Sequence, residues 1–439
     1  MAIIIRRQLL FTLLLVMASA QGADLVEVYE QAEATNPTLA AAAANLRAVQ
    51  ETRPQAIAGL LPVISADGSY SRKRFKPRNP SEDATFSNDK IASLDLVQPL
   101  FRFDRWIQLK QSDSEIAAAE AEFVAAQQDL MVKIAERYFK VLDAEDNVEF
   151  AKAEKSSIGR QLEQATQRFE VGLIAITDVT SAQARYDLST SQEIRVISEL
   201  VQAKDSLREI AGRYYDDLAK LKPDLELVAP DPSTPEDWID KAMQQNLQVL
   251  AAQANSETAR QEIRRQRAGH LPTLDMNASI RYIDNEFGGL TPVRRDDSEI
   301  GVQLRIPIYE GGLVNSRTRE ARDRFQQSSD QLEQAVREAE LGTRNAFRSV
   351  LTDIAQVNAL QQSVKSTKIA VEGEEAGHEV GTRTIVDVLN AQREYYLAVL
   401  NYARARYLYV VDQLRLKRAA GILNFNDIEE VNRSLAAEK

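Results

Sequence analysis

The sequence contains no cysteine and only two histidines, His270 and His378, among its 439 residues. Without cysteine the chain has no disulfide framework, no thiolate nucleophile and no zinc–thiolate site. Two histidines far apart in the sequence leave little for a histidine metal cluster, so we predict neither a metal nor another cofactor. Phosphate-binding loops, nucleophile elbows and metalloprotease motifs are also missing from the sequence. We therefore predict no catalytic residues, and an enzyme is the least favoured class.

Positive charge is in the minority. The chain has 54 lysines and arginines against 65 aspartates and glutamates, a formal net charge of -11. Proteins that hold nucleic acid or an anionic membrane through a broad basic face usually carry the opposite excess. We therefore predict no nucleic-acid partner.

Long apolar runs are scarce as well. The clearest one, Leu9 to Met17, follows Arg6 and Arg7 and precedes small residues, which is typical of an export signal. It is too short to cross about 30 Å of hydrocarbon as a helix. We interpret residues 1–23 as a signal peptide with cleavage near Ala20 to Ala23. No later stretch could span a membrane as a helix, so any insertion must use strands.

Proline is missing from two long tracts, between Pro99 and Pro223 and after Pro307. Tracts without proline permit very long helices. Apolar residues recur every seven positions within both tracts, which is the pattern of a coiled-coil seam. We predict two helical hairpins, over about 105–213 and 312–420. The residues at this spacing are Ile116, Phe123, Leu130, Ile134, Val141 and Val148, and then Phe325, Leu332, Ala339, Ala346, Val336, Val350 and Val357.

An internal duplication organises the chain. The segment Val171 to Val179 recurs as Val380 to Val388, about 209 residues later, and each copy is followed by Ala-Gln and a tyrosine. Asn36 recurs as Asn246 in the same register. We predict a first repeat at 24–222, a linker at 223–245, a second repeat at 246–420 and a C-terminal segment at 421–439.

The duplicated segment contains a turn signal. Gly172 and Gly381 each follow the end of a predicted long helix, where glycine usually supplies a left-handed cap. Thr177-Asp178 in the first copy, and Thr384 in the second, would begin the returning helices. We therefore place both glycines at the tips of the two hairpins.

Four segments alternate between apolar and polar residues, the pattern of strands with two different faces. We predict strands over about 61–75, 87–100, 271–285 and 298–308. A proline stands near each change between helix and strand, where it can neither continue a helix nor donate to a ladder. These junction prolines are Pro62, Pro99, Pro272 and Pro307.

Four strands alone would leave open sheet edges and an uncovered apolar face. Three copies would close a twelve-stranded antiparallel barrel with its apolar face toward lipid. The residues thus favour a mainly α fold with β strands, exported and oligomeric. A soluble sandwich would leave the long helices unexplained. The runner-up function is a secreted coiled-coil structural or adaptor protein without a membrane barrel, which outer-membrane fractionation would distinguish.

Several strings resemble the TolC-like family of outer-membrane efflux proteins, and the similarity covers about Asp24 to Leu435. The resemblance implies a homotrimer in the cell outer membrane, with a twelve-stranded transmembrane β-barrel in contact with lipid and a coiled-coil tunnel reaching into the periplasm. It also implies an equatorial band made from segments about 24–50, 214–245 and 421–439. The strings that carry it are Phe169 to Val179, Gly269 to Asp275, Ile306 to Gly312 and Val380 to Leu389.

The same resemblance implies a function without catalysis. Such a protein is the exit duct of tripartite efflux pumps or type I secretion systems. Its partners would be a periplasmic adaptor protein and an inner-membrane transporter of the RND, ABC or MFS type. The periplasmic entrance would open when the adaptor docks.

Residues of the gate are also implied by the resemblance. Arg383 would bond Asp178 and Thr177 in the neighbouring hairpin, and Gln161 would lie opposite Glu375. An exposed Arg–Asp contact is worth only about 1 kcal/mol or less, which suits a latch that an adaptor releases.

Three further positions would shape the entrance. Asp387 matches an aspartate that forms a ring at the family's constriction, where carboxylates favour cations. Asn390 occupies a second ring position where the family has aspartate, which predicts weaker block by multivalent cations. His378 replaces the gate tyrosine, and histidine is the side chain whose charge changes closest to neutral pH. A conductance that varies between about pH 5 and 8 would follow.

Overall fold

The computed structural model describes residues 22–76, 85–287 and 293–435. Of the predicted export signal at residues 1–23, residues 1–21 lie outside the described residues. The chain divides into two compact units. The first comprises Met1–Ala42, Phe123–Leu247 and Val336–Lys439, and the second comprises Ala43–Glu122 and Gln248–Ala335.

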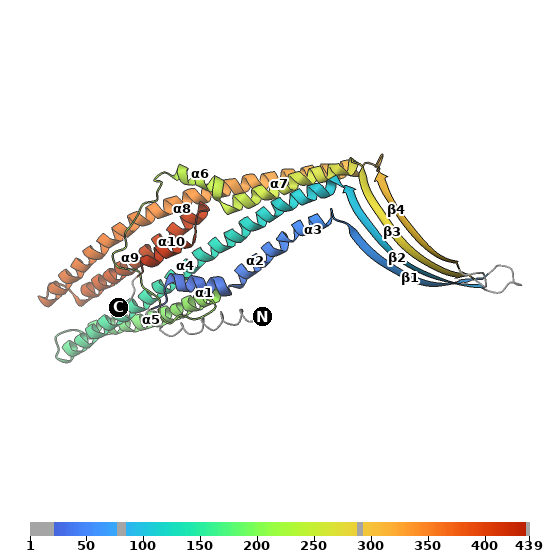
Figure 1. The fold of residues 1–439 in the computed structure, drawn as a ribbon. Coiled ribbons are helices and arrows are strands. Elements are labelled where there is room, and N and C mark those ends of the chain that lie inside the picture. Colours follow the sequence, from blue (N-terminus) through green and yellow to red (C-terminus); the bar gives the residue numbers. More distant parts are fainter. Residues whose placement is uncertain (1–21, 77–84, 288–292, 436–439) are drawn as a thin grey trace, which may run out of the picture. The chain divides into compact units, whose positions relative to one another are not determined.

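The second unit contains one antiparallel sheet in the order β1-β2-β3-β4 (Figure 1). β1 and β2 form one hairpin, β3 and β4 form another, and β2 pairs with β3 along the seam between the two repeats. β1 and β4 are therefore the two edges. The strands are β1 (Val63–Phe75), β2 (Thr85–Phe101), β3 (Thr273–Phe287) and β4 (Val293–Arg305).

The two faces of the sheet differ in chemistry. The register aligns Ile64, Leu96, Ala278 and Ile300 in one row across all four strands. Side chains alternate along a strand, so the even-numbered residues share one face, which we call the apolar face. Ile300 on this face is 77% exposed, although burial of an apolar side chain is worth about 1.5 to 3 kcal/mol. The odd-numbered face carries mostly polar residues, such as Ser65, Asp95, Ser279 and Glu299 in one row.

Two details of the strands differ from the prediction. β4 begins at Val293 and ends at Arg305, rather than covering 298–308. Its early part has charged residues on both faces, which hides the alternation, and Pro307 cannot donate to a ladder. Pro99 lies inside β2 and not at its end, and the register between β2 and β3 shifts between Pro99 and Phe101. A missing backbone donor explains that irregularity.

Each repeat contains two long helices that form a hairpin (Figure 1). Two of them, α4 and α8, contribute residues to both units. The sequence predicts both long tracts, and their ends agree with the prediction to within about two residues, the usual uncertainty of a helix end. The helices of the hairpins are α4 (Phe103–Glu170), α5 (Ile176–Ala211), α8 (Leu313–Glu379) and α9 (Ile385–Ala419). The shorter helices are α1 (Leu25–Thr35), α2 (Pro37–Gln50), α3 (Thr52–Ala58), α6 (Pro235–Gln245), α7 (Leu247–Arg267), η1 (Ala268–His270) and α10 (Phe425–Arg433).

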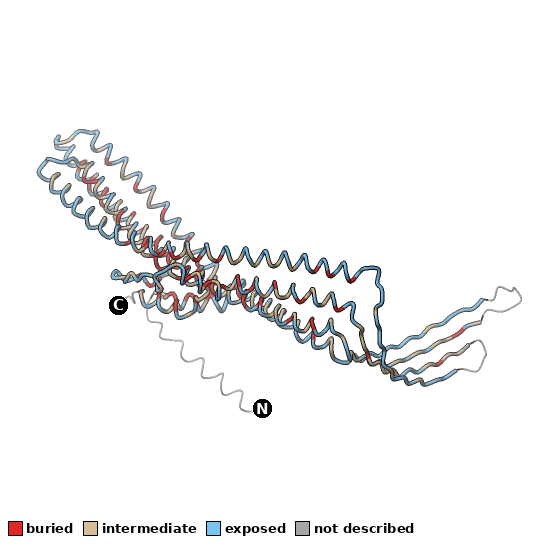
Figure 2. The backbone as a smooth tube through the Cα atoms, turned by 90° about the horizontal axis from the view of Figure 1, so that it is seen from above, coloured by how far each residue is buried: buried red, intermediate tan, exposed pale blue. Residues whose placement is uncertain are grey.

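Buried side chains recur every seven residues in the hairpins of the first unit. Ile134, Val141 and Val148 of α4 are buried at that spacing, and so are Val350 and Val357 of α8. The returning helix α5 has the same seven-residue spacing of buried side chains, which its sequence did not lead us to predict. In Figure 2, short buried stretches alternate with exposed ones along the long helices. The buried residues of α5 at this spacing are Ala182, Ser189, Val196 and Ala203.

A continuous core surrounds the middle of the hairpins in the first unit. Tyr138 of α4 is fully buried, and its hydroxyl lies 3.0 Å from the carbonyl oxygen of Ala23 and 2.8 Å from that of Ala219. α1 packs on α10, where the rings of Tyr29 and Phe425 are 5.7 Å apart. The segments near both ends of the chain and the linker between repeats therefore share one core.

Within the described residues, none of the helices combines the length and the apolarity needed to cross a membrane.

Candidate functional site at the hairpin tips

Both hairpins of the first unit end in a glycine turn. Gly172 has φ 74° and Gly381 has φ 80°, the left-handed conformation predicted from the sequence. Leu173 N–H donates to the carbonyl of Arg168, and Thr382 N–H donates to that of Gly377. A side chain larger than hydrogen would strain either glycine. Each tip is thus a hydrogen-bonded turn that depends on a left-handed glycine.

The two tips begin their returning helices differently. Thr384 caps α9: its hydroxyl accepts from Asp387 N–H, while the Asp387 carboxylate accepts from Thr384 N–H over 2.9 Å. The hydroxyl and then the backbone N–H of Thr384 hold the pKa of Asp387 below its usual range. At the first tip the equivalent cap is Ala175, whose side chain makes no such bond. Only the second tip therefore carries the reciprocal cap.

Arg383 lies in the second tip, and within one chain it does not reach Asp178 or Thr177. Its guanidinium pairs with Glu374 of α8 over 3.3 Å. The carboxylate of Asp178 has no hydrogen bond or ion pair among the described residues. The latch from Arg383 to Asp178 and Thr177 in the neighbouring hairpin stays a prediction, and it would have to compete with Glu374.

Gln161 and Glu375 are connected through a third residue, Gln392 of α9. Gln161 Nε2 donates to Gln392 Oε1 over 3.2 Å, and Gln392 Nε2 donates to Glu375 Oε1 over 2.8 Å. Ser157 Oγ also donates to Gln392 Oε1, over 2.7 Å. Gln161 is only 8% exposed. Within one chain Gln161 and Glu375 are thus linked only through Gln392, in a relay from α4 through α9 to α8, and the direct tie between them stays a prediction.

Gln392 was not among the predicted gate residues. Its signal in the sequence was the Ala-Gln pair that follows the tip segment in both repeats. The equivalent Gln183 bonds only to Asp187, one turn further along its own helix, over 2.9 Å. Equivalent glutamines in the two repeats thus have different partners. The sequence does not indicate which of the two would connect the hairpins.

His378 joins the two hairpins near their tips. Its Nδ1 lies 3.1 Å from the carbonyl oxygen of Arg383, and its Nε2 lies 3.4 Å from a guanidinium nitrogen of Arg168 on α4. Since a carbonyl can only accept and a guanidinium can only donate, both contacts require neutral imidazole with its proton on Nδ1. Protonation would turn Nε2 into a donor facing a cation.

Asn390 also bridges the hairpins. A guanidinium nitrogen of Arg185 on α5 donates to Asn390 Oδ1 over 3.2 Å. Aspartate, which the family pattern has at this position, would form an ion pair with the same arginine. The asparagine keeps the hydrogen bond and leaves the charge of Arg185 uncompensated there.

Further from the tips, α9 bonds to α4 through more buried groups. Tyr407 donates to Asp146 over 2.7 Å, and Arg404 pairs with Asp143 over 3.1 Å. Burial raises the pKa of Asp146, and it also raises the pKa of Tyr407. Buried polar pairs resist separation more than exposed ones. The two hairpins are therefore joined by buried groups here, whereas the contacts of His378 and Asn390 nearer the tips are exposed.

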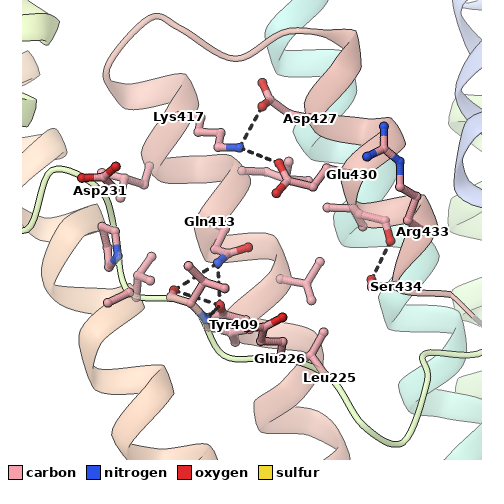
Figure 3. A pocket seen from close by; sticks show the side chains of 18 of the residues that line it. Leu225, Glu226, Asp231, Tyr409, Gln413, Lys417, Asp427, Glu430, Arg433 and Ser434 are labelled. Atoms are coloured by element: carbon pink, nitrogen blue, oxygen red, sulfur yellow. Dashed lines mark hydrogen bonds and ion pairs between the residues drawn. The ribbon is translucent and has the colours of Figure 1, made fainter.

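A cavity of about 530 Å³ lies between the linker after α5 and helices α9 and α10 (Figure 3). Tyr409 and Gln413 bond the linker at Val228 on one side. On the other side Lys417 pairs with Asp427 over 2.8 Å and with Glu430 over 3.2 Å. These bonds pair the side chains of Tyr409, Gln413 and Lys417 in the wall. No cluster of three metal-ligating side chains occurs within the part of the chain that the structure describes.

Comparison with known proteins agrees with this architecture. The family model for the outer membrane efflux protein matches residues 28–213 and 238–422. The outer membrane protein TolC of Vibrio cholerae is 37% identical over 96% of this chain and 96% of its own length. The alkaline protease secretion protein AprF of Pseudomonas aeruginosa is 27% identical over 95% of this chain and 89% of its own.

A solved structure shows the same fold. The outer membrane protein VceC of Vibrio cholerae superposes with a TM-score of 0.76 at 22% identity, covering 90% of this chain and 96% of that one. Paired helical hairpins with glycine tips, together with a four-stranded antiparallel sheet, define an outer-membrane channel protein that reaches into the periplasm. The match over both repeats is decisive: the chain belongs to the outer membrane efflux protein family.

Proposed function

We propose that three copies of the chain assemble into one exit duct through the outer membrane. The observation that carries this proposal is the exposed apolar face of the sheet, together with its two unpaired edges. Strand directions alternate through the sheet, so β4 of one copy can pair antiparallel with β1 of the next. Three copies then make a twelve-stranded barrel, which removes every edge and places the apolar face against lipid.

The duct serves type I protein secretion, drug efflux or both. The relative AprF is named for the secretion of alkaline protease, and the TolC relative is similar to this chain over nearly all of its length. A channel of this kind transports nothing by itself. It requires a periplasmic adaptor protein and an inner-membrane transporter of the RND, ABC or MFS type, which together open the tips. The chain needs no catalytic group for this role.

Opening is a rearrangement of the tips. The relay through Gln392, the contact of His378 with Arg168, and the contact of Asn390 with Arg185 each join the two hairpins. The two exposed contacts, of His378 and Asn390, contribute roughly 0.2 to 1 kcal/mol each, and the hydrogen bonds of the partly buried relay contribute about 0.5 to 1.5 kcal/mol each. Their sum is small enough for adaptor docking to outweigh. The α4–α9 contacts further from the tips stay in place, so the tunnel above the gate stays closed to the periplasm.

Deletion of the gene tests the proposal. We expect loss of the secreted proteins or new sensitivity to drugs, and we expect the protein in the outer-membrane fraction. Pull-down of the intact protein from native membranes should recover an adaptor and an inner-membrane transporter. A protein found only in the soluble secreted fraction would instead support the coiled-coil structural or adaptor alternative.

A further inference from the structure

The apolar face of the sheet changes character toward the hairpin turns. Its apolar rows end at the row that contains Ala92 and Tyr282. From that row onward, toward residues 77–84 and 288–292, the same face carries four cations and three carboxylates. The cations are Arg72, Arg74, Lys90 and Arg294, and the carboxylates are Asp284, Glu286 and Asp296.

The charges are not mixed evenly on this face. All three carboxylates lie on β3 and β4, while β1 and β2 carry three of the cations and no carboxylate. Asp284 is 6% exposed and is shared by Lys90 at 3.7 Å and Arg294 at 3.4 Å. One carboxylate thus neutralises only one of its two partners. The β1–β2 side is therefore a local basic patch.

Two arginines of the patch are held by an aromatic ring and not by an acid. The guanidinium of Arg72 lies 4.6 Å from the centre of the Phe86 ring, and that of Arg74 lies 5.9 Å from it. Neither forms an ion pair within the described residues, and both are exposed. Stacking on a ring positions a guanidinium while leaving its N–H groups free to donate.

We propose that this patch, formed by Tyr70, Arg72, Arg74, Phe86 and Lys90, binds the phosphate-bearing headgroup of an outer-leaflet lipid. The proposal rests on the proposed function, because it requires the apolar face to contact lipid. Residues just beyond the apolar rows then lie at headgroup depth, where aromatic side chains such as Tyr70 and Phe86 are favoured. Along the chain, these strand ends are the ones farthest from the helices, so in the proposed duct this depth belongs to the outer leaflet.

The chemistry of the patch suits phosphate on a lipid. Guanidinium groups bind phosphate oxygens in pairs of parallel hydrogen bonds, and Lys90 adds a point charge. The apolar rows below would hold the acyl chains of the same molecule. The net charge of -11 excludes a broad basic surface, but it does not describe this local distribution. Each trimer would offer three such sites.

The test uses the full mature trimer in phosphatidylcholine vesicles doped with a phosphorylated lipid A or with its dephosphorylated form. Native mass spectrometry measures the lipid retained per trimer. We expect selective retention of the phosphorylated lipid, and roughly tenfold weaker retention in an Arg72→Ala, Arg74→Ala double variant. An Arg72→Lys, Arg74→Lys variant keeps the charge and should retain an intermediate amount.

Lys73 is the matched control, because it lies between the two arginines on the opposite face and pairs with Asp89 over 2.7 Å. Lys73→Ala should bind lipid as the wild type does. Equal retention of both lipids, equal loss in Lys73→Ala, or displacement of the lipid by inorganic phosphate would overturn the proposal. Ion current is recorded in the same preparation. Current without lipid selectivity rejects this proposal alone, whereas failure to insert rejects the proposed function as well.

Discussion

Ser157 of the first hairpin donates its hydroxyl hydrogen to Oε1 of Gln392 in the second, over 2.7 Å. The same amide oxygen accepts from Gln161, and its nitrogen donates to Glu375. One side chain therefore joins three helices close to the tips. No other tip residue in the part of the chain that the structure describes makes three such bonds between helices.

Gln392→Ala should loosen the closed entrance. The substitution removes three hydrogen bonds, and it leaves Gln161 buried without a partner for its amide nitrogen. Loss of such a partner costs about 1 to 3 kcal/mol. We expect more frequent opening in single-channel recordings without adaptor, and greater sensitivity of cells to large antibiotics.

Gln183→Ala provides the control for that experiment, since Gln183 has the equivalent position in the first repeat and bonds only within its own helix. It should leave opening unchanged. Equal effects of the two variants would mean that the relay does not hold the gate.

His378 should help to hold the two hairpins together. Its ring accepts from Arg168 of the first hairpin and donates to the carbonyl of Arg383 in the second. His378→Phe removes both hydrogen bonds, so single-channel recordings without adaptor should show more frequent opening. Opening as rare as in the wild type would exclude this role.

Thr384 should keep Asp387 charged in acid. The hydroxyl and backbone N–H of Thr384 lower the pKa of the carboxyl group, so it loses its charge only at a pH below the usual range. Block of the current by a trivalent cation should therefore persist in acid in the wild type. In Thr384→Val, which lacks the hydroxyl, the block should weaken at a higher pH. An identical pH profile in both proteins would show that the cap does not tune this ring.

Asp353 of α8 should make the trimer less stable as the pH rises. Burial, and then the neighbouring Asp412 carboxylate, raises the pKa of Asp353 to about 7, while Arg415 opposes the shift. Arg415 also pairs with Glu136 of α4 and with Asp412. Since the folded state binds this proton more tightly than the unfolded chain, stability falls as the pH rises from about 4 to about 7.

The substitution Asp353→Asn removes that loss. At pH 8 it should stabilise the trimer by roughly 1 to 3 kcal/mol, with little change at pH 4, as measured by thermal melting. Asp323→Asn, at an exposed position on the same helix, should have no effect at either pH. Equal melting curves for Asp353→Asn and the wild type at pH 8 would show that repulsion between Asp353 and Asp412 does not lower the stability of the trimer.

Sequence periodicity predicted the large elements because those elements repeat. Heptads located α4 and α8, alternation located the strands, and Gly172 and Gly381 marked turns that have positive φ. The extent of β4 was predicted wrongly, since Val293 to Asp297 carry charge on both faces. This part of β4 is recognised only by its pairing with β3, because its own residues do not alternate between apolar and polar.

The tip contacts were less accessible to sequence. The pairing of Arg383 with Glu374, and the position of Gln392 between Gln161 and Glu375, depend on how the hairpins are oriented about their axes. Periodicity gives the face of a helix but not which polar groups meet across two helices. Gln183 and Gln392 are identical in the repeat and differ only in these neighbours.

Crosslinking of β1 to β4 between copies tests the central claim most directly. Because the natural chain has no cysteine, Ser65→Cys on β1 with a single cysteine moved along β4 from Ser298 to Leu304 reports only this pairing. Oxidation in native outer membranes should give linked species that stop at three chains. The control pair Leu96→Cys and Ala278→Cys, which are partners in the register of β2 and β3, should link within one chain. Monomers at every β4 position, despite efficient linkage of the control, would contradict the trimeric barrel.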